Sequence, residues 1–424
     1  MSEARVSEGV LLRGVRNAGR GLPAGFGVLW TTVAVDLLGF GIVVPLLPLY
    51  ARRLGAGPAS VGLLLAAFSA AQFVSAPLLG RLSDRIGRKP LLIVSLAGTA
   101  AASLLTGVAG SLWLLVVARV LDGASGGSVA VAQASATDMV GRQDRVRVFG
   151  LLGAAYGVGF VIGPAIGGLA ALGGPRIPFF VAAGIAGLNA VIAVRRLPET
   201  RPRPGQGADP DGGSAHTLRS VLTRMAVPAT ITVVLVASFS AFEATFALFG
   251  QRRLGFGLAS IGAVFAMVGV VAVVVQGGLV RPLAARIGDV GCLRFGLVTE
   301  AFGLVLVATV HSRAALVIPL VLVTVGQSLC TPSLNALVVG RIGDGRRGTA
   351  LGAQQGLSAL ARIIGPTVGG LSYEVLGIGA PFVEGGVAVA VALVFSLVMR
   401  AGLTTSPRMV VEPPAHRLPL SNNG

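Results

Sequence analysis

Twelve long runs of apolar residues divide the chain, and each is long enough to cross a ~30 Å hydrocarbon layer as a helix that rises 1.5 Å per residue. Of the residues, 54% are hydrophobic and only 12% are charged. In soluble domains about a quarter of the residues are charged. The sequence therefore predicts an all-α integral membrane protein with twelve transmembrane helices. The runs cover approximately residues 27–50, 61–79, 91–109, 112–136, 148–171, 176–195, 227–249, 258–280, 291–310, 314–339, 348–372 and 379–400.

The distribution of positive charge predicts the orientation of these helices. An even number of spans places both termini on one side of the membrane. The odd-numbered loops hold six of the 34 Lys and Arg residues; Arg119 and Arg362 lie inside spans, and the others lie in the termini, the even-numbered loops and the helix ends beside them. Because cytoplasmic loops carry an excess of Lys and Arg, we expect both termini in the cytoplasm of a multi-pass cell-membrane protein. The six are Arg52, Arg53, Arg176, Arg252, Arg253 and Arg313.

The two halves of the chain repeat each other. Arg-Arg-Leu-Gly-x-Gly-x-Ala-Ser at 52–60 recurs at 252–260, Arg-Ile-Gly at 85–87 recurs at 286–288, and Gly-Pro-x-x-Gly-Gly at 163–168 recurs at 365–370. A duplicated unit of six spans predicts two pseudo-symmetric bundles around a central cavity near the middle of the membrane. The cavity predicts a transporter whose halves rock against each other.

The expected domain boundaries follow from the spans. The Pro- and Gly-rich stretch between the halves is typical of a flexible linker. We expect a cytoplasmic N-terminal segment at 1–26, an N-terminal six-helix bundle at 27–195, a cytoplasmic linker at 196–226, a C-terminal six-helix bundle at 227–400 and a cytoplasmic tail at 401–424.

The stretch Gly-Arg-Leu-Ser-Asp-Arg-Ile-Gly-Arg-Lys-Pro at 80–90 places five charges in an expected turn between the second and third spans. It resembles the loop 2-3 signature of the major facilitator superfamily, and the twelve spans in two related halves extend that resemblance over the whole chain. The resemblance implies that Asp84 lies against the N-terminus of span 11, that the Arg residues bond the end of span 4, and that the turn acts as a gate. In the alternative interpretation the charges only anchor the loop and set the topology. The second half has Ala285 where the acid would map. The candidate gating residues are Gly80, Asp84, Arg85, Gly87, Arg88 and Lys89.

An acidic residue lies inside the first span. Asp36 is about nine residues from the start of the span, at a depth where a charge costs about 2.5 kcal/mol or more. An apolar environment favours the neutral carboxyl group, so Asp36 could bind a proton on one side and release it on the other. The pattern Asp-x-x-Gly-x-Gly-x-x-x-Pro at 36–45 resembles the first span of twelve-span drug:H+ antiporters, including the tetracycline exporters. A hydrogen bond from Asp36 to neighbouring backbone is the alternative.

Span 5 is rich in glycine. Small residues on one helix face let two helices approach closely, and Pro164 kinks this helix. The string resembles the antiporter signature of the superfamily, which is associated with exporters, and this resemblance implies efflux. The residues that carry it are Gly157, Gly163, Pro164, Gly167 and Gly168.

Further polar residues in the spans are candidate proton-coupling and cavity-lining residues. Arg119 in span 4 resembles the arginine that the family implies in proton transfer, and Asp122 stands where an amide is more usual. The two share a helix face at i and i+3, so they form either a proton route or a structural bridge. Glu243 in span 7 resembles the cavity acid of multidrug exporters, and Arg362 could pair with Glu243 or with Glu300. Candidate cavity-lining residues are Gln133, Gln327, Asn335 and Arg362; amides also bridge helices for stability.

These observations predict proton-coupled efflux of drug-like or amphipathic small molecules by alternating access. The alternatives are an efflux carrier for sugars or other metabolites, and a proton-independent uniporter. No Walker-type phosphate loop is present in the sequence, and no paired acids, His cluster or nucleophile-base set indicates an enzyme. Neither the two cysteines nor the three histidines indicate a metal site. We expect a monomer that binds its small-molecule substrate, protons and lipid, with no cofactor and no nucleic acid.

Overall fold

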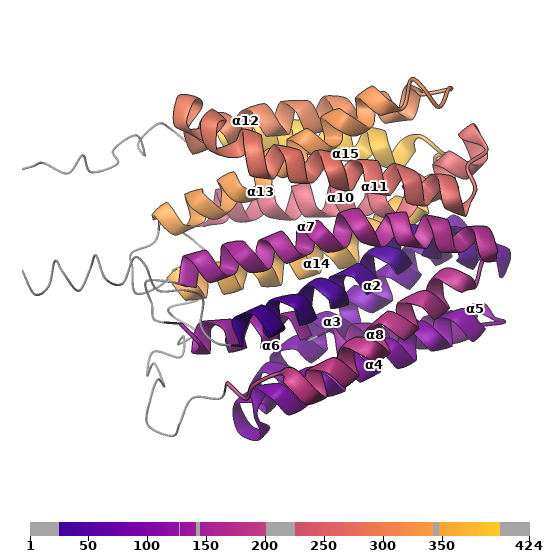
Figure 1. The fold of residues 1–424 in the computed structure, drawn as a ribbon. Helices are drawn as coiled ribbons and strands as arrows, with labels where there is room; N and C mark the ends of the chain where they lie inside the picture. Colours follow the sequence, from indigo (N-terminus) through magenta and orange to yellow (C-terminus); the bar gives the residue numbers. More distant parts are fainter. Residues whose placement is uncertain (1–24, 127, 141–144, 201–224, 342–346, 399–424) are drawn as a thin grey trace, which may run out of the picture.

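A computed structural model describes residues 25–126, 128–140, 145–200, 225–341 and 347–398, and every regular element in these ranges is a helix (Figure 1). The helices of the first half are α2 (Phe26–Arg53), α3 (Pro58–Ile86), α4 (Arg88–Val108), α5 (Leu112–Ser125), α6 (Ser128–Asp138), α7 (Arg145–Ala170) and α8 (Ile177–Arg196), with a short 3₁₀ helix, η1 (Ala171–Gly173), after α7.

The second half has the same order of elements. Its helices are α10 (Ala226–Leu254), α11 (Leu258–Val274), α12 (Val280–Thr309), α13 (Val317–Arg341), α14 (Arg347–Val375) and α15 (Ala380–Val398). A π-helical segment, η2 (Val275–Leu279), joins α11 to α12. Eight helical stretches of the described residues are long and apolar enough to cross a membrane, and one of them, Leu258–Thr309, contains two successive predicted spans.

The boundaries of the predicted spans need three corrections. Predicted span 4 is divided into α5 and α6 near Gly126. Predicted spans 8 and 9 are joined by continuous helix except at Gly288, where φ is +72°. The stretch at 80–90 is almost entirely helical, because α3 continues to Ile86 and α4 begins at Arg88. Hydropathy misses these extensions because it ends a span at the first charges, whereas the backbone hydrogen bonds of the helix continue past them.

The sequence repeat marks equivalent turns in the two halves. Gly55 and Gly255, which end α2 and α10, have φ of +87° and +64°. Gly87 and Gly288 have φ of +111° and +72°. Glycine adopts this left-handed backbone without the steric cost that a Cβ atom brings, so the repeated glycines fix the turns of both halves.

The turns lie on two opposite faces of the molecule. We use "loop-1 face" for the end that carries residues 54–57, 109–111, 171–176, 255–257, 310–316 and 376–379, and "loop-2 face" for the end that carries Gly87, Gly288 and the starts of α2 and α10. Most helices of the first half lie in the lower part of Figure 1 and most of those of the second half in the upper part, and α7 and α14 overlap between them. Helix α3 contacts α14, α7 contacts α11, and α2 contacts α10 across the boundary between the halves.

The two halves approach most closely near the loop-1 face. A Cβ atom on Gly168 would lie 3.1 Å from the Cα atom of Gly262, and one on Gly370 would lie 3.1 Å from that of Gly62. Toward the loop-2 face, by contrast, a Cβ atom on Gly80, Gly277 or Gly278 would meet open space. The described arrangement is therefore closed between the halves on the loop-1 side.

We expect Gly41→Ala to destabilise the protein by about 1–3 kcal/mol, because overpacking a close helix contact forces backbone shifts. A Cβ atom on Gly41 would lie 2.5 Å from the carbonyl oxygen of Gly159 in α7. The matched control is Gly184→Ala in α8, where a Cβ atom meets nothing within 4 Å and the better helix propensity of Ala leaves stability equal or higher. Thermal unfolding of the purified variants in detergent checks both, and equal unfolding temperatures for the two variants would contradict the packing argument.

Candidate functional site

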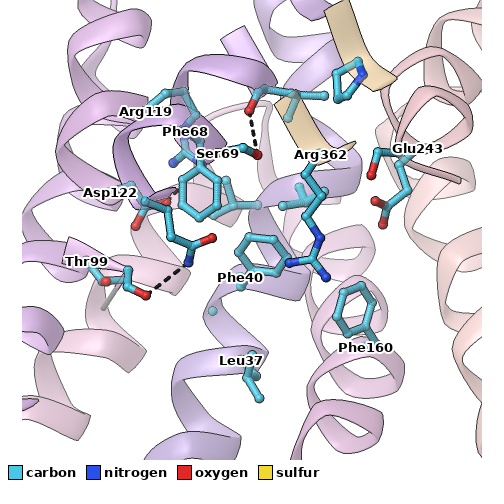
Figure 2. A pocket seen from close by; sticks show the side chains of 18 of the residues that line it. Leu37, Phe40, Phe68, Ser69, Thr99, Arg119, Asp122, Phe160, Glu243 and Arg362 are labelled. Carbon is cyan, nitrogen blue, oxygen red and sulfur yellow. Dashed lines mark hydrogen bonds and ion pairs between the residues drawn. The ribbon is translucent and has the colours of Figure 1, made fainter. Parts of the chain in front are cut away.

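A cavity of about 230 Å³ lies between the two halves. Residues of α2, α3, α4, α5 and α7 line it from one side, and residues of α10, α13 and α14 line it from the other (Figure 2). Among the described residues, no group of three or more His, Cys, Asp or Glu side chains is arranged to hold a metal ion. The cavity is the place where both halves can act on one small molecule.

The structure brings most of the predicted polar residues to this cavity. Its lining includes Asp36 of α2 and Glu243 of α10, which are the first helices of their respective halves. The other predicted residues that line it are Arg119, Asp122, Gln327 and Arg362. Six side chains from five helices thus converge, although they are separated by up to several hundred residues in sequence.

Arg119 and Asp122 form a buried ion pair at one end of the cavity. The Nη1 atom of Arg119 lies 3.0 Å from Oδ2 of Asp122, and the Arg119 side chain is 1% exposed. Arg119 also donates to the hydroxyl of Thr106 at 3.5 Å, and its guanidinium lies 5.8 Å from the ring centroid of Phe68. The hydroxyl of Thr99 bonds Asp122. This network neutralises two charges that would be costly if they were buried alone.

Arg362 enters the cavity from α14 and extends between Phe40 and Phe160 (Figure 2). It lies close enough to Glu243 for their opposite charges to attract each other. Among the described residues, no electrostatic attraction between Arg362 and Glu300 is found. The structure therefore favours Glu243 over Glu300 as the partner of Arg362.

The sequence analysis did not predict the aromatic lining of the cavity. Phe40, Phe68, Phe160 and Phe239 line it, and the ring centroid of Phe40 lies 5.6 Å from that of Phe68 and 6.1 Å from that of Phe160. Phe40 follows Asp36 by four residues, which places both on one face of a helix, so this spacing was a usable signal. Most of the phenylalanines of α10 belong to the core: Phe242, Phe246 and Phe249 are buried and pack together.

Two of the amides predicted to line the cavity do not line it. Asn335 is exposed on α13, eight residues closer to the loop-2 face than Gln327. Gln133 is half-buried on α6, seven residues beyond Gly126 in the same direction. Both lie about two helical turns away from the lined volume, because hydropathy assigns a residue to a span without giving its depth.

The glycines of α7 pack this helix against both halves. Gly159, Gly163 and Gly167 lie against α2: a Cβ atom on Gly163 would be 2.7 Å from the carbonyl oxygen of Leu38. Gly157 and Gly168 lie against α11, where a Cβ atom would be 3.2 Å from Val273 and 3.1 Å from the carbonyl oxygen of Ala259. Pro164 lies inside the helix, and its carbonyl oxygen faces Gly262. The glycine string therefore forms a contact surface between the halves beside the cavity.

Arg88 organises the loop-2 face of the first half. It forms ion pairs with Asp84 at 2.7 Å and with Asp138, the last residue of α6, at 2.9 Å. Glu199, which sequence reasoning missed, accepts the backbone N–H groups of Arg88 at 2.9 Å and Lys89 at 3.2 Å. A carboxylate at this position stabilises the N-terminus of α4.

The structure places Asp84 elsewhere than at the N-terminus of span 11, where the family resemblance implied it. The Asp84 side chain pairs with Arg88 and is 62% exposed, and a contact with the N-terminus of α14 is not among the interactions of the described residues. Residues 342–346, which precede α14, lie outside the described ranges. Gly80 has open space around it, and Arg85 is exposed. The arrangement agrees with halves that are separated at the loop-2 face.

A hydrogen bond joins the two halves at the loop-1 face. The Oε2 atom of Glu374, at the end of α14, accepts the backbone N–H of Ala59 in the first turn of α3 at 3.0 Å. Glu374 also lies 3.2 Å from the position of a Cβ atom on Gly57. The sequence analysis could not find this pair, because 315 residues separate its members.

Comparison with known sequences places the chain in one family. The sequence pattern of the family described as the Major Facilitator Superfamily matches residues 29–291 and 278–422. The chain is 30% identical over 349 residues to the class C tetracycline resistance protein of Escherichia coli, an alignment that covers 80% of this chain and 87% of that protein. It is 27% identical over 380 residues to multidrug resistance protein 1 of Bacillus subtilis (strain 168), with 88% and 96% covered.

A solved structure has the same fold. The crystal structure of the human organic anion transporter MFSD10 (TETRAN) superposes with a TM-score of 0.66 and 24% identity, covering 88% of this chain and 98% of that one. The predicted all-helical transporter fold is thus confirmed, and so is the prediction of a transporter rather than an enzyme. The chain belongs to the major facilitator superfamily and is a multi-pass transporter of the cell membrane.

Proposed function

We propose that this protein exports drug-like, amphipathic small molecules in exchange for protons, by alternating access between two six-helix bundles. The single observation that supports this most directly is the cavity between the halves, into which Asp36 and Glu243 place carboxyl groups from equivalent helices. Its aromatic lining suits an apolar cargo, and its acids suit a proton or a positive charge. Relatives that are named as tetracycline and multidrug resistance proteins support efflux of this class of cargo.

The two acids have different roles in this proposal. Arg362 offsets part of the cost of burying the ionised form of Glu243, and we assign Glu243 to the positive charge of the cargo. Asp36 is then the main proton carrier. Arg119 and Asp122 form a neutral pair beside them that can pass a proton toward Asp36 through the cavity.

The proposed orientation follows from the distribution of charge. The loop-2 face carries most of the basic residues, and we assign it to the cytoplasm. The described state, which is closed at the loop-1 face, is then inward-facing. In this proposal the protein works as a monomer and binds no nucleic acid. Its two bundles are residues 27–195 and 227–400, and a cytoplasmic linker joins them.

The proton gradient supplies enough free energy for this cycle. A proton that moves down 100 mV releases ~2.3 kcal/mol, which corresponds to a roughly 50-fold concentration ratio of a neutral cargo exchanged one for one. One-for-one exchange with a cationic cargo moves no net charge and is driven by the pH difference alone, about tenfold per pH unit. The chain therefore requires no nucleotide site for uphill export.

Reconstituted vesicles with an acidic interior test the proposal. We expect tetracycline or an amphipathic cation such as ethidium to accumulate inside and to leave when nigericin collapses the pH difference. Equilibration without accumulation would indicate a uniporter, and the absence of any flux of either compound would reject this cargo class.

We expect Glu374→Gln to shift the protein toward the state that is open at the loop-1 face by about two- to fivefold. An exposed carboxylate at a helix N-terminus stabilises its contact by about 0.3–1 kcal/mol, and this contact with Ala59 must break when the halves separate. Spin labels at Gly110 and Gly257, which lie in loop-1-face turns of different halves and have open space around them, measure the distance between the halves. Glu384→Gln in α15 is the control, and equal distance distributions for both variants would remove Glu374 from the closing contact.

A further inference from the structure

Arg362 is a charged residue of the cavity that the proposed mechanism uses only as a neighbour of Glu243. It belongs to α14 in the second half, and its side chain extends between Phe40 of α2 and Phe160 of α7 in the first half (Figure 2). Arg362 is exposed, and it lines the cavity. A molecule bound beside its guanidinium would therefore contact residues of both halves.

The hydrogen-bond donors of Arg362 have no protein partner among the described residues. Within these residues, the Arg362 guanidinium forms no hydrogen bond and no ion pair. Arg119, which also lines the cavity, is by contrast 1% exposed, pairs with Asp122 at 3.0 Å and donates to Thr106. A guanidinium carries five N–H donors in a fixed planar fork. Those of Arg119 are engaged by protein groups, whereas those of Arg362 are available to a bound molecule.

Glu243 lies near Arg362 but does not occupy its donors. Their opposite charges attract each other, yet the two side chains form no contact ion pair in the part of the chain that the structure describes. The two residues thus present a positive and a negative group on the wall of one cavity. A molecule with two opposite charges is complementary to this arrangement, whereas a simple cation is attracted by Glu243 and repelled by Arg362.

We propose that Arg362 binds an anionic oxygen group of the cargo, such as a carboxylate, and that the preferred cargo is an amphipathic zwitterion. Resting on the proposed export function, this assigns the negative group of the cargo to Arg362, its positive group to Glu243 and its apolar body to the phenylalanines. Arginine binds a carboxylate through two parallel N–H···O bonds, a geometry that lysine does not reproduce. Hydrogen bonds between charged groups contribute about a ten- to hundredfold difference in affinity.

Equilibrium binding of two fluorescent compounds that differ only in a carboxylate tests the proposal. The first is ε-dansyl-lysine, a zwitterion with an aromatic body, and the second is dansylcadaverine, the same molecule without the carboxylate and therefore a cation. We expect the purified wild-type protein in detergent to bind ε-dansyl-lysine at least about tenfold more tightly, measured by the rise of dansyl fluorescence. Equal affinities, a preference for dansylcadaverine, or binding of neither compound would overturn the proposal.

Variants of Arg362 test whether this residue makes the distinction. We expect Arg362→Gln to weaken binding of ε-dansyl-lysine about tenfold or more and to leave binding of dansylcadaverine equal or stronger, because a repulsive charge is removed. Arg362→Lys keeps the charge and should recover only part of the affinity for the zwitterion. Arg281→Gln removes an exposed arginine of α12 outside the cavity lining and should change neither affinity. Equal losses for both compounds in Arg362→Gln would reject the anion site.

A Glu243→Gln background separates direct binding by Arg362 from an effect that acts through Glu243. Direct binding predicts that Arg362→Gln still weakens ε-dansyl-lysine binding in this background, whereas an indirect effect predicts no further loss, which would reject the proposal. No proton gradient is used, so a failure of gradient-driven export would reject the proposed function and leave the anion site standing. Thermal unfolding identifies a variant that has lost its fold; if Arg362→Gln is one, Arg362→Lys and the wild-type preference decide the outcome.

Discussion

Asp36→Asn is expected to abolish proton-driven accumulation of cargo while exchange of cargo across the membrane continues. Asparagine has nearly the same shape as aspartate but binds no exchangeable proton, so the cavity keeps its lining and loses its proton carrier. With a pH difference of one unit and one-for-one exchange, accumulation should fall from a limit of about tenfold to equality of the two sides.

The measurement compares two assays in the same reconstituted vesicles. Gradient-driven uptake reports coupling, whereas exchange of labelled for unlabelled cargo reports binding and alternation of the halves. Asp289→Asn is the matched control, because Asp289 is an exposed acid near the turn at Gly288, outside the cavity. Retained accumulation in Asp36→Asn, together with its loss in Glu243→Gln, would transfer the proton-carrying role to Glu243.

Arg119→Ala is expected to destabilise the protein by about 3–5 kcal/mol, because it leaves Asp122 buried without its partner. The double replacement of Arg119 and Asp122 by leucine removes both charges together and should recover most of the lost stability. Thermal unfolding in detergent measures this recovery. If Arg119→Ala unfolds at the wild-type temperature, the pair contributes no net stability.

The same double variant separates a structural bridge from a proton route. A bridge that serves only stability would allow the stable double variant to accumulate cargo at the wild-type rate. The proposed route through Asp122 instead predicts a folded protein with at least tenfold slower proton-driven uptake and near-normal exchange. Both interpretations were open from the sequence, and the uptake rate decides between them.

The fold follows from sequence features that act locally. The twelve apolar runs give the helices, and the repeated glycines at 55 and 255 give turns with positive φ in both halves. Asp36 and Glu243 could be selected because a carboxyl group inside a long apolar run is costly wherever the helix lies. These inferences depend on residues within one span of each other and on the energetics of the bilayer.

The contacts that sequence reasoning missed join distant parts of the chain. Glu199 accepts the backbone N–H of Arg88, 111 residues away, and Glu374 accepts that of Ala59, 315 residues away. The positions of Gln133 and Asn335 relative to the cavity were also beyond the sequence, because hydropathy assigns a residue to a span without giving its depth. A single sequence specifies which residues are buried in lipid more readily than which of them meet.

The central claim, that cargo is exchanged for protons, is tested most directly when an outward cargo gradient is used to move protons into vesicles. Vesicles loaded with tetracycline, with equal pH on both sides and the membrane voltage clamped by valinomycin and potassium, are diluted into cargo-free buffer while an internal pH dye is recorded. Cargo that leaves through the wild-type protein should acidify the interior. Cargo that leaves through the Asp36→Asn protein should not change the internal pH. Tetracycline efflux through the wild-type protein without a change of internal pH would contradict proton exchange.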